Sequence, residues 1–184
     1  MYKILTIRDS IKVKPSNLSS DIYKSIEKSL KEKYEGSITG NGIIIKVIKV
    51  KSFSQGRIIP LDPNIHFVVE FEALAYVPEI GEVVYGKVIE ITKLGAFVRI
   101  GPLDGFVHLS QIMDDFISFD EKNKILFGKN TKKTLKIGDL VRAKIISISK
   151  EQGIKIGLTM RQPGLGSLIW IEKEKKEKAK SKKK

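Results

Sequence analysis

The chain has 184 residues, of which 41% are hydrophobic, and a formal net charge of +13. This length suits one large or two small domains with real cores. The absence of cysteine excludes disulfides, thiolate metal sites and cysteine nucleophiles, and two distant histidines, His66 and His108, do not suffice for a zinc site. No apolar run approaches the roughly 18 residues that would span a bilayer, and the N-terminus lacks a signal-peptide pattern. We therefore expect a soluble, cytoplasmic protein.

Part of the positive charge lies in residues 172–184, which carry eight lysines and three glutamates and leave a net charge of +8 on the rest of the chain. A body this basic favours a polyanionic partner, and a solvated, lysine-rich surface explains the charge equally well. The composition of residues 172–184 predicts a disordered tail. Such a tail attracts nucleic acid non-specifically or only keeps the protein soluble.

Residues 1–80 are expected to form an α+β domain, an antiparallel sheet with one helix, RNP-like. The predicted strands are residues 1–8, 11–13, 43–50 and 66–77. A helix capped by Ser20 is predicted by an apolar stripe that recurs every four residues: Ile22, Ile26, Leu30 and Tyr34. Gly36 ends this helix, and Pro78 and Gly81 mark the domain boundary.

The second domain, residues 81–171, reads as a barrel of five strands: residues 83–91, 95–100, 106–109, 139–148 and 154–160. The connection between the third and fourth strands is long for a barrel of this size and forms an insert, residues 111–137. We expect the apolar residues of the insert to pack on the barrel and its lysines to remain solvated.

Alternation within the barrel strands places aromatic and basic side chains on one open face. Ala96, Val98 and Ile100 point inward, so Phe97 and Arg99 point outward. In the next strand Val107 and Leu109 are expected to be buried, which leaves Phe106 and His108 outside. Single-stranded nucleic acid needs such rings for stacking and such charges for its phosphates. The predicted RNA-binding residues are Lys87, Phe97, Arg99, Phe106, His108, Arg142, Lys144 and Lys155. The alternative is an aromatic cluster that only completes the barrel.

Catalysis finds little support in the sequence. His108 and Ser110 project to one strand face, but no third group that would orient the histidine is evident. The pairs Asp114-Asp115 and Asp120-Glu121 lack the spacing of a calcium loop and are expected to cap turns or oppose lysines. We predict no metal, no cofactor and no catalytic residue.

Three motifs stand in a fixed order: G-A-F-V at 95–98, G-P-L-D-G-F-V-H-L-S at 101–110 and G-D-L-V-R-A-K at 138–144. Together they resemble the S1 RNA-binding domain, a five-stranded OB-type barrel. The sequences of residues 71–86, 127–133 and 159–166 extend the resemblance to residues 1–171. Over that length the chain resembles the larger stalk subunit of archaeal DNA-directed RNA polymerase, called E′ or subunit 7, the counterpart of the seventh subunit of eukaryotic polymerase II.

The resemblance implies a non-catalytic polymerase subunit that pairs with the small stalk subunit. It also implies binding of nascent single-stranded RNA and assistance in promoter opening, elongation and termination. The polymerase core would be docked by two loops of the first domain, through Gly36, Gly40, Asn41, Gly42, Asp62, Pro63 and Asn64. The partner surface would include Leu165, Leu168 and Trp170, although Trp170 also suits simple packing.

Two departures and two alternatives accompany this interpretation. Leu94 stands where many S1 domains have a second aromatic residue, and Ser149-Lys150 replaces an acidic residue often found there, so modest and sequence-tolerant RNA affinity is expected. The main alternative is an independent S1 protein of the exosome or translation-initiation type, which need not carry the first domain. A nuclease or phosphorylase is disfavoured, because the clustered carboxylates that metal-assisted chemistry requires are absent.

Overall fold

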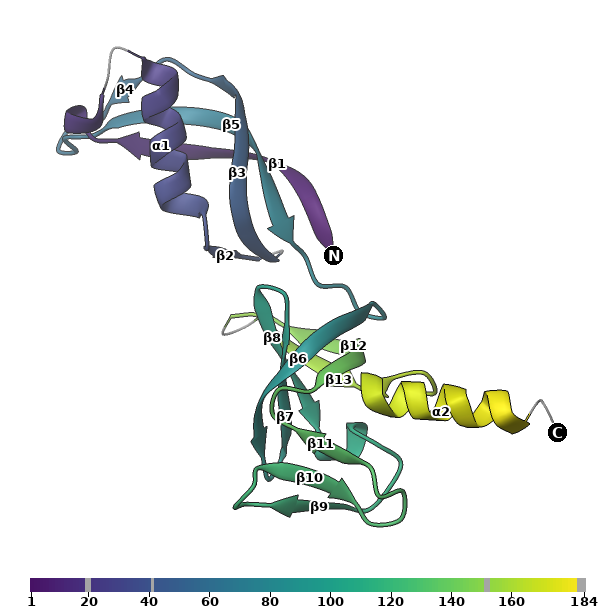
Figure 1. Ribbon diagram of the computed structural model, residues 1–184. Helices are drawn as coiled ribbons and strands as arrows, with labels where there is room; N and C mark the ends of the chain where they lie inside the picture. The colour runs from purple at the N-terminus through teal and green to yellow at the C-terminus, as the bar shows by residue number, and fades with distance from the viewer. Residues whose placement is uncertain (19–20, 41, 151–152, 182–184) are drawn as a thin grey trace. The chain divides into compact units, whose positions relative to one another are not determined.

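The computed structural model describes residues 1–18, 21–40, 42–150 and 153–181 and divides into two compact units, Met1–Val77 and Pro78–Lys184 (Figure 1). This division lies three residues before the boundary expected from the sequence. None of the helices in the described ranges is long and apolar enough to cross a membrane.

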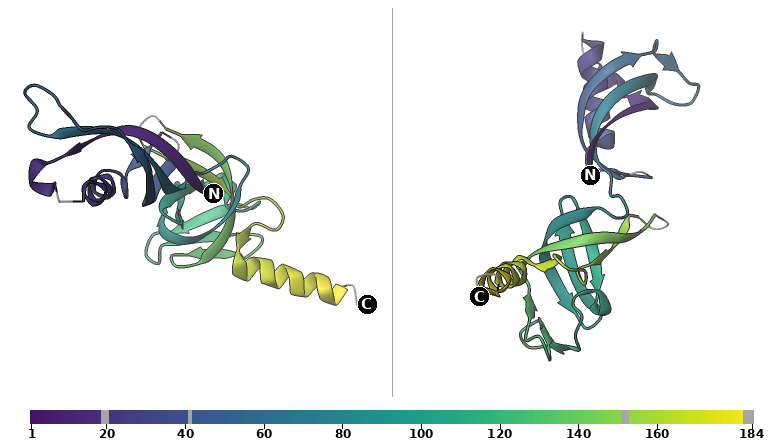
Figure 2. Two further views of the ribbon diagram at one scale, coloured as in Figure 1. Left: turned by 90° about the horizontal axis from the view of Figure 1, so that it is seen from above. Right: turned by 90° about the vertical axis from the view of Figure 1, so that its right-hand side faces the viewer.

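The first unit is an antiparallel sheet with one α-helix on one of its faces; from above, α1 lies on one side of the sheet (Figure 2). Its elements are β1 (Tyr2–Val13), the short 3-10 helix η1 (Pro15–Asn17), α1 (Ile22–Tyr34), β2 (Ile38–Thr39), β3 (Gly42–Phe53), β4 (Arg57–Ile58) and β5 (Ile65–Tyr76). The strand order is β1-β5-β3-β2, with β4 paired to β5. β1 is one continuous strand, where we expected two segments, because it pairs with β5 along its whole length.

The helix α1 begins after Asp21, whose side chain accepts a hydrogen bond from the Lys24 backbone N–H at 3.4 Å. The expected cap, Ser20, lies outside the described residues. Ile26, Leu30 and Tyr34 are buried against the sheet, but Ile22 is exposed. Four residues turn a helix by about 400°, so side chains spaced by four lie about 40° further around the helix at each step. At the first turn this rotation directs Ile22 away from the sheet.

The core-facing side chains of β3 come at intervals of three rather than two. Ile44, Val47 and Val50 are buried, and the register with β5 shifts between each of them. Each shift inserts one extra residue into β3. Because of the extra residue, every third side chain, and not every second one, faces the helix. The core of the first unit therefore lies between α1 and residues of β1, β3 and β5.

The second unit contains a closed barrel of five strands. Its elements are β6 (Val83–Thr92), β7 (Gly95–Ile100), β8 (Leu103–His108), the 3-10 helix η2 (Leu109–Gln111), β9 (Ile117–Asp120), β10 (Ile125–Gly128), β11 (Thr134–Lys136), β12 (Leu140–Ser149), β13 (Lys155–Thr159), β14 (Gly166–Ser167) and α2 (Leu168–Ser181). The barrel order is β13-β8-β7-β6-β12, and β13 also pairs with β12, which closes it. All five strands were expected from the sequence, with ends displaced by up to three residues.

The insert forms a small antiparallel sheet of its own, in the order β11-β10-β9. Among its apolar residues, Ile112, Met113, Leu126 and Leu135 are buried, as expected. The expectation was wrong for Phe116, Phe127 and Ile137, which are exposed. β10 is the central strand of this sheet and pairs antiparallel with both β9 and β11. The insert is therefore an ordered addition to the barrel and not a loose connection.

The tail expectation was wrong for residues 172–181, because they belong to α2 (Figure 1). Glutamate, lysine and alanine are good helix formers. The first turn is fixed to the barrel through Trp170, whose indole N–H donates to the Thr134 carbonyl oxygen at 3.1 Å. Residues 182–184 lie outside the described ranges.

Candidate nucleic-acid interface

Phe97 and Phe106 form the centre of the predicted face. They are directly paired across β7 and β8, with ring centroids 5.0 Å apart and planes inclined by 51°. The His108 ring stands edge-on to Phe106, at a centroid distance of 6.5 Å. Both phenylalanines are half-buried, whereas Ala96, Val98 and Val107 are fully buried inside the barrel. The alternation inferred from the sequence is thus confirmed from Ala96 to Val107. It was wrong for Leu109, which is half-buried and lies in η2 after the end of β8.

A groove of about 600 Å³ lies beside the phenylalanine pair, and its other wall is formed by β12 and β13. Phe97, Phe106, Ile148 and Ile154 give it apolar walls, and Lys155 lines it with a positive charge. This volume falls within the range of about 300–1,000 Å³ typical of ligand sites. Apolar rings beside a cation suit a nucleotide base that stacks while its phosphate is neutralised.

Arg99 lies on this face, but its guanidinium is already bound. Its Nε and Nη2 donate to the two carboxylate oxygens of Asp104, at 2.9 and 3.2 Å. This contact raises the pKa of Arg99. Asp104 is the cross-strand partner of Arg99 in the β7–β8 hairpin, and its position five residues later was the sequence signal that we missed. Arg99 is consequently not a free phosphate ligand in this conformation.

The other predicted cations divide into two groups. Lys87 on β6 lies opposite Arg99 on β7 in the strand register and is exposed. Lys155 lines the groove. Arg142 instead stacks on Tyr85, donates to its hydroxyl at 2.6 Å and donates to the Gly164 carbonyl oxygen at 3.3 Å. Lys144 is half-buried on β12 and does not line the groove. The structure thus brings Lys155 to the phenylalanines and gives Arg142 another partner.

Glu90 is a residue of this face that the sequence interpretation did not include. It is exposed and is the cross-strand partner of Phe97, since a register shift at Ile89 brings it opposite the ring. Cross-strand partners share one face of a sheet. A carboxylate beside the stacking site lowers the local positive charge and is consistent with modest RNA affinity.

His108 lacks the surroundings of a catalytic base in the described part of the chain. Its Nδ1 lies 2.8 Å from the Ser110 hydroxyl and 3.3 Å from the Ser110 backbone nitrogen, an arrangement that caps the η2 turn. No carboxylate of the described residues contacts the imidazole to orient it. Among these residues there is also no group of three side chains that would hold a metal ion.

The acidic pairs of the insert stabilise turns, as expected. The Asp115 carboxylate accepts hydrogen bonds from the backbone N–H groups of Asn130 and Thr131 and from the Thr131 hydroxyl, which lowers the pKa of Asp115. Asp120 accepts from Lys122 and Asn123 and has a lowered pKa for the same kind of reason. Asp114 pairs with Arg161.

The two predicted docking loops lie at opposite ends of the first unit. The loop with Gly36, Gly40 and Gly42 adjoins Ile43, which pairs with Tyr76 at the end of β5. The loop with Asp62, Pro63 and Asn64 precedes Ile65, the first residue of that strand. Twelve residues of extended strand separate the two ends, so one docking tip cannot include both loops. Asn41 lies outside the described residues.

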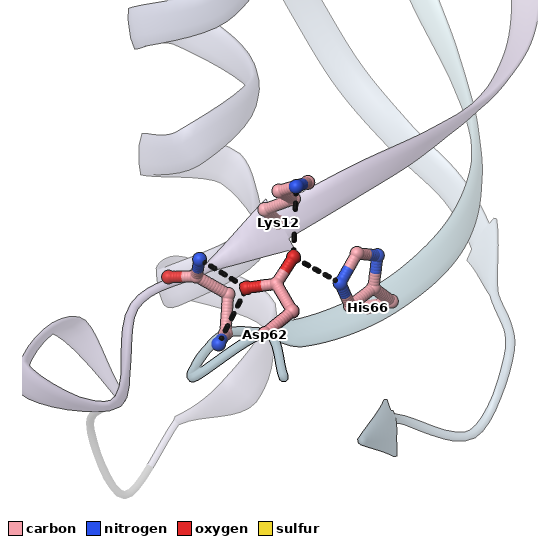
Figure 3. Close-up of polar contacts among 4 residues, drawn as sticks. Lys12, Asp62 and His66 are labelled. Atoms are coloured by element: carbon pink, nitrogen blue, oxygen red, sulfur yellow. Dashed lines mark hydrogen bonds and ion pairs between the residues drawn. The ribbon is translucent and has the colours of Figure 1, made fainter. Parts of the chain in front are cut away.

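The loop around Asp62 is held by a polar network (Figure 3). The Asp62 carboxylate accepts hydrogen bonds from the Lys12 ammonium at 2.8 Å and the Asn64 backbone N–H at 3.0 Å, and it lies 2.9 Å from Nε2 of His66. The Lys12 contact is the main cause of the strongly lowered pKa of Asp62. The adjacent Leu61 is fully exposed and has a φ of 69°, which is unfavourable for leucine. The network therefore fixes a loop that presents an apolar side chain to solvent.

The predicted partner residues are less exposed than expected. Trp170 is 7% exposed and packs on Gly166 within its own unit, so it is a packing residue. Leu165 and Leu168 are half-buried. Leu168 lines a shallow hollow of about 270 Å³ together with Tyr85 and Leu140, which are exposed.

Comparison with known proteins matches both units. Residues 77–159 match the S1 RNA binding domain, and residues 8–63 match the SHS2 domain found in the N terminus of Rpb7p/Rpc25p/MJ0397. The DNA-directed RNA polymerase subunit Rpo7 of Saccharolobus shibatae is 36% identical over 180 residues, which cover 96% of this chain and 100% of the relative. The DNA-directed RNA polymerase II subunit RPB7 of Saccharomyces cerevisiae is 27% identical, over 91% of this chain and 100% of the relative.

Among solved structures, the apo form of Mycoplasma genitalium RNase R is 33% identical and has a TM-score of 0.39. The match covers 43% of this chain and 13% of that chain. A likeness this partial carries no functional argument for the protein.

The fold and the two matched domains define a protein that joins an SHS2 domain to an S1 RNA-binding barrel. The near full-length relatives make the assignment narrower: the chain belongs to the Rpo7/Rpb7 family of DNA-directed RNA polymerase subunits. This membership favours the polymerase over the independent S1 protein that the sequence had left open.

Proposed function

We propose that the chain is a non-catalytic stalk subunit that binds nascent single-stranded RNA in the groove beside Phe97 and Phe106. The observation that carries this proposal is the phenylalanine pair itself, two half-buried rings that line an apolar groove with Lys155. A purely structural aromatic cluster would be covered by neighbouring side chains. These rings instead border an open space of nucleotide size.

The proposal includes two protein contacts. Residues 57–65, which comprise β4 and the loop that leads into β5, dock on the polymerase core. The fixed geometry of this segment and its exposed apolar side chains, Ile58 and Leu61, support this contact. The small stalk subunit covers the apolar hollow of Tyr85, Leu140 and Leu168. In this role the chain guides RNA as it leaves the enzyme and influences promoter opening, elongation and termination through the core.

Alanine substitution of both phenylalanines tests the RNA-binding role. Stacking on an aromatic side chain is worth about 1–3 kcal/mol per base, so Phe97→Ala with Phe106→Ala should weaken single-stranded RNA binding at least tenfold. The loss should be similar at every salt concentration, because stacking does not release counterions. The measurement is RNA binding by the chain purified with its polymerase partners.

Circular dichroism and recovery with the polymerase serve as controls for this double variant. Folding should survive, since the barrel core is built from Ala96, Val98, Val107 and their buried neighbours. Unchanged RNA affinity in a folded, polymerase-associated variant would refute the stacking role.

A further inference from the structure

A second basic site lies in the second unit, between the insert and α2. A hollow of about 520 Å³ is lined by Lys132, Lys133, Lys136, Lys173, Trp170 and Glu174, among others. We call it the basic hollow. None of its residues belongs to the groove beside the phenylalanines.

The charges around the basic hollow do not cancel. Glu174 pairs with Lys133 at 2.6 Å. Asp139, the other acidic residue of the lining, accepts a hydrogen bond from the Lys136 backbone N–H at 2.9 Å. Lys132, Lys136 and Lys173 form no ion pair within the described ranges, and all three are exposed. Four lysines and two carboxylates line the hollow, which leaves a net charge of +2. A phosphate-bearing anion offsets this surplus of positive charge.

The turn that carries Lys132 is rigid. Lys132 has a φ of 53°, a conformation that is uncommon and unfavourable for a long side chain. The Asp115 hydrogen bonds to Asn130 and Thr131 hold the residues just before it, and the Lys132 N–H donates to the Gly128 carbonyl oxygen at 3.0 Å. A strained residue that its surroundings hold in place is a feature of functional sites.

The helix side of the basic hollow is anchored as well. The Trp170 indole donates to the Thr134 carbonyl oxygen, and the Lys133 ammonium lies 5.6 Å from the centre of the indole ring. These contacts fix the first turns of α2, from which Lys173 lines the hollow. Lys176 follows three residues later, on the same side of the helix. The positive charge therefore continues from the hollow along α2.

We propose that the basic hollow binds the phosphate backbone of single-stranded RNA, as a contact separate from the stacking groove. Lysine is a compact point charge that suits phosphate oxygens without demanding one geometry. The phenylalanine groove itself offers little free charge, since Arg99 is bound to Asp104 and Glu90 lies opposite Phe97. Trp170 is buried and Ile169 is the exposed apolar side chain of the lining. Four lysines surround this one aliphatic group, so the hollow suits a polyanion better than the large apolar anchor of a protein partner.

A salt series tests this site. The variant Lys132→Gln, Lys136→Gln, Lys173→Gln is compared with Lys14→Gln, Lys28→Gln, Lys46→Gln, which removes the same charge from exposed lysines of the first unit. The probe is a labelled oligouridylate, bound by the full chain. Each phosphate contact on a single strand contributes about 0.7 to the slope of log affinity against log salt. The hollow variant should lose about 2 from that slope, and the control variant much less.

The effect should persist when the three hollow substitutions are placed in the Phe97→Ala, Phe106→Ala background, which separates this site from the stacking groove. Equal slopes in the hollow and control variants would overturn the hollow as an RNA site and leave the stacking groove unaffected. The inference rests on the proposed RNA-binding function, which a wild-type chain that does not bind the oligouridylate at low salt would overturn. A loss of binding to polyglutamate without a loss of RNA binding would also overturn it, because it would identify the hollow as a site for an acidic protein segment.

Discussion

Arg99 lies on the exposed face of β7 beside the phenylalanine pair, yet Asp104 occupies its guanidinium. A carboxylate and an RNA phosphate compete for the same fork of donors. The pair is exposed to solvent, so it contributes little to the stability of the fold. Its main consequence is to reduce the charge available to RNA.

Replacing Asp104 with asparagine should therefore strengthen RNA binding. The change frees Arg99 for one phosphate, which should raise the salt slope by about 0.7 and the affinity at low salt several-fold. RNA binding across a salt series measures both. Glu27→Gln is the matched control, since it makes the same charge change by removing the Glu27–Lys31 pair of α1. A slope equal to that of the control would show that Arg99 does not reach the RNA even when released.

At the scale of elements, residues 57–65, which comprise β4 and the loop that leads into β5, combine a fixed backbone with exposed apolar side chains. Ile58 is 79% exposed and Leu61 is fully exposed. The pKa of Asp62 is lowered, so its network stabilises the loop above the carboxyl's unfolded value of about 3.9 and is lost only as the pH falls through the lower folded value. The Asp62 carboxylate should thus keep its charge, and its contacts with Lys12 and Asn64, at any pH near neutrality.

Serine at both Ile58 and Leu61 should weaken association with the polymerase core. Each substitution removes an exposed apolar group, so the free chain should keep its stability while losing part of a buried contact in the complex. Recovery of the variant with the large polymerase subunits is the measurement. Leu94→Ser is the control, because Leu94 is also exposed but belongs to the second unit. Equal recovery of both variants would exclude this loop as the docking element.

At the scale of the whole molecule, each unit has a hydrophobic core of its own. Phe71 is fully buried in the first unit and contacts Tyr34 at a ring distance of 4.9 Å. Leu158 is buried in the barrel against Gly105. Since stability is distributed among cooperative regions of a structure, a cavity in one core should act mainly on the unit that contains it.

We expect Phe71→Ala to cost about 3–5 kcal/mol and Leu158→Ala about 2–5 kcal/mol. Amide hydrogen exchange followed by residue is the measurement. Protection should fall first in β1, β3 and β5 for Phe71→Ala, and first in the barrel strands for Leu158→Ala. Equal loss of protection in both units, for either variant, would show that they unfold as one.

The sequence alone determined the elements whose pattern is local. Alternation at residues 95–100 predicted β7 and its outward ring, Phe97, because neighbouring side chains of a strand take opposite faces. It also sufficed for the S1 barrel, the turn-capping role of Asp115 and the position of α1. The bulges of β3 were not predicted, since the insertion of an extra residue depends on the register with the partner strand, β5.

Only the tertiary structure decided which side chains meet. It bound Arg99 to Asp104 and Arg142 to Tyr85, placed the two expected docking loops at opposite ends of β5, and buried Trp170. It also ordered residues 172–181 as a helix, because Trp170 and Glu174 attach its first turns to the insert. Pairing between charges and contact between distant elements depend on positions in space, which a pattern of hydrophobic and polar residues along the chain does not specify.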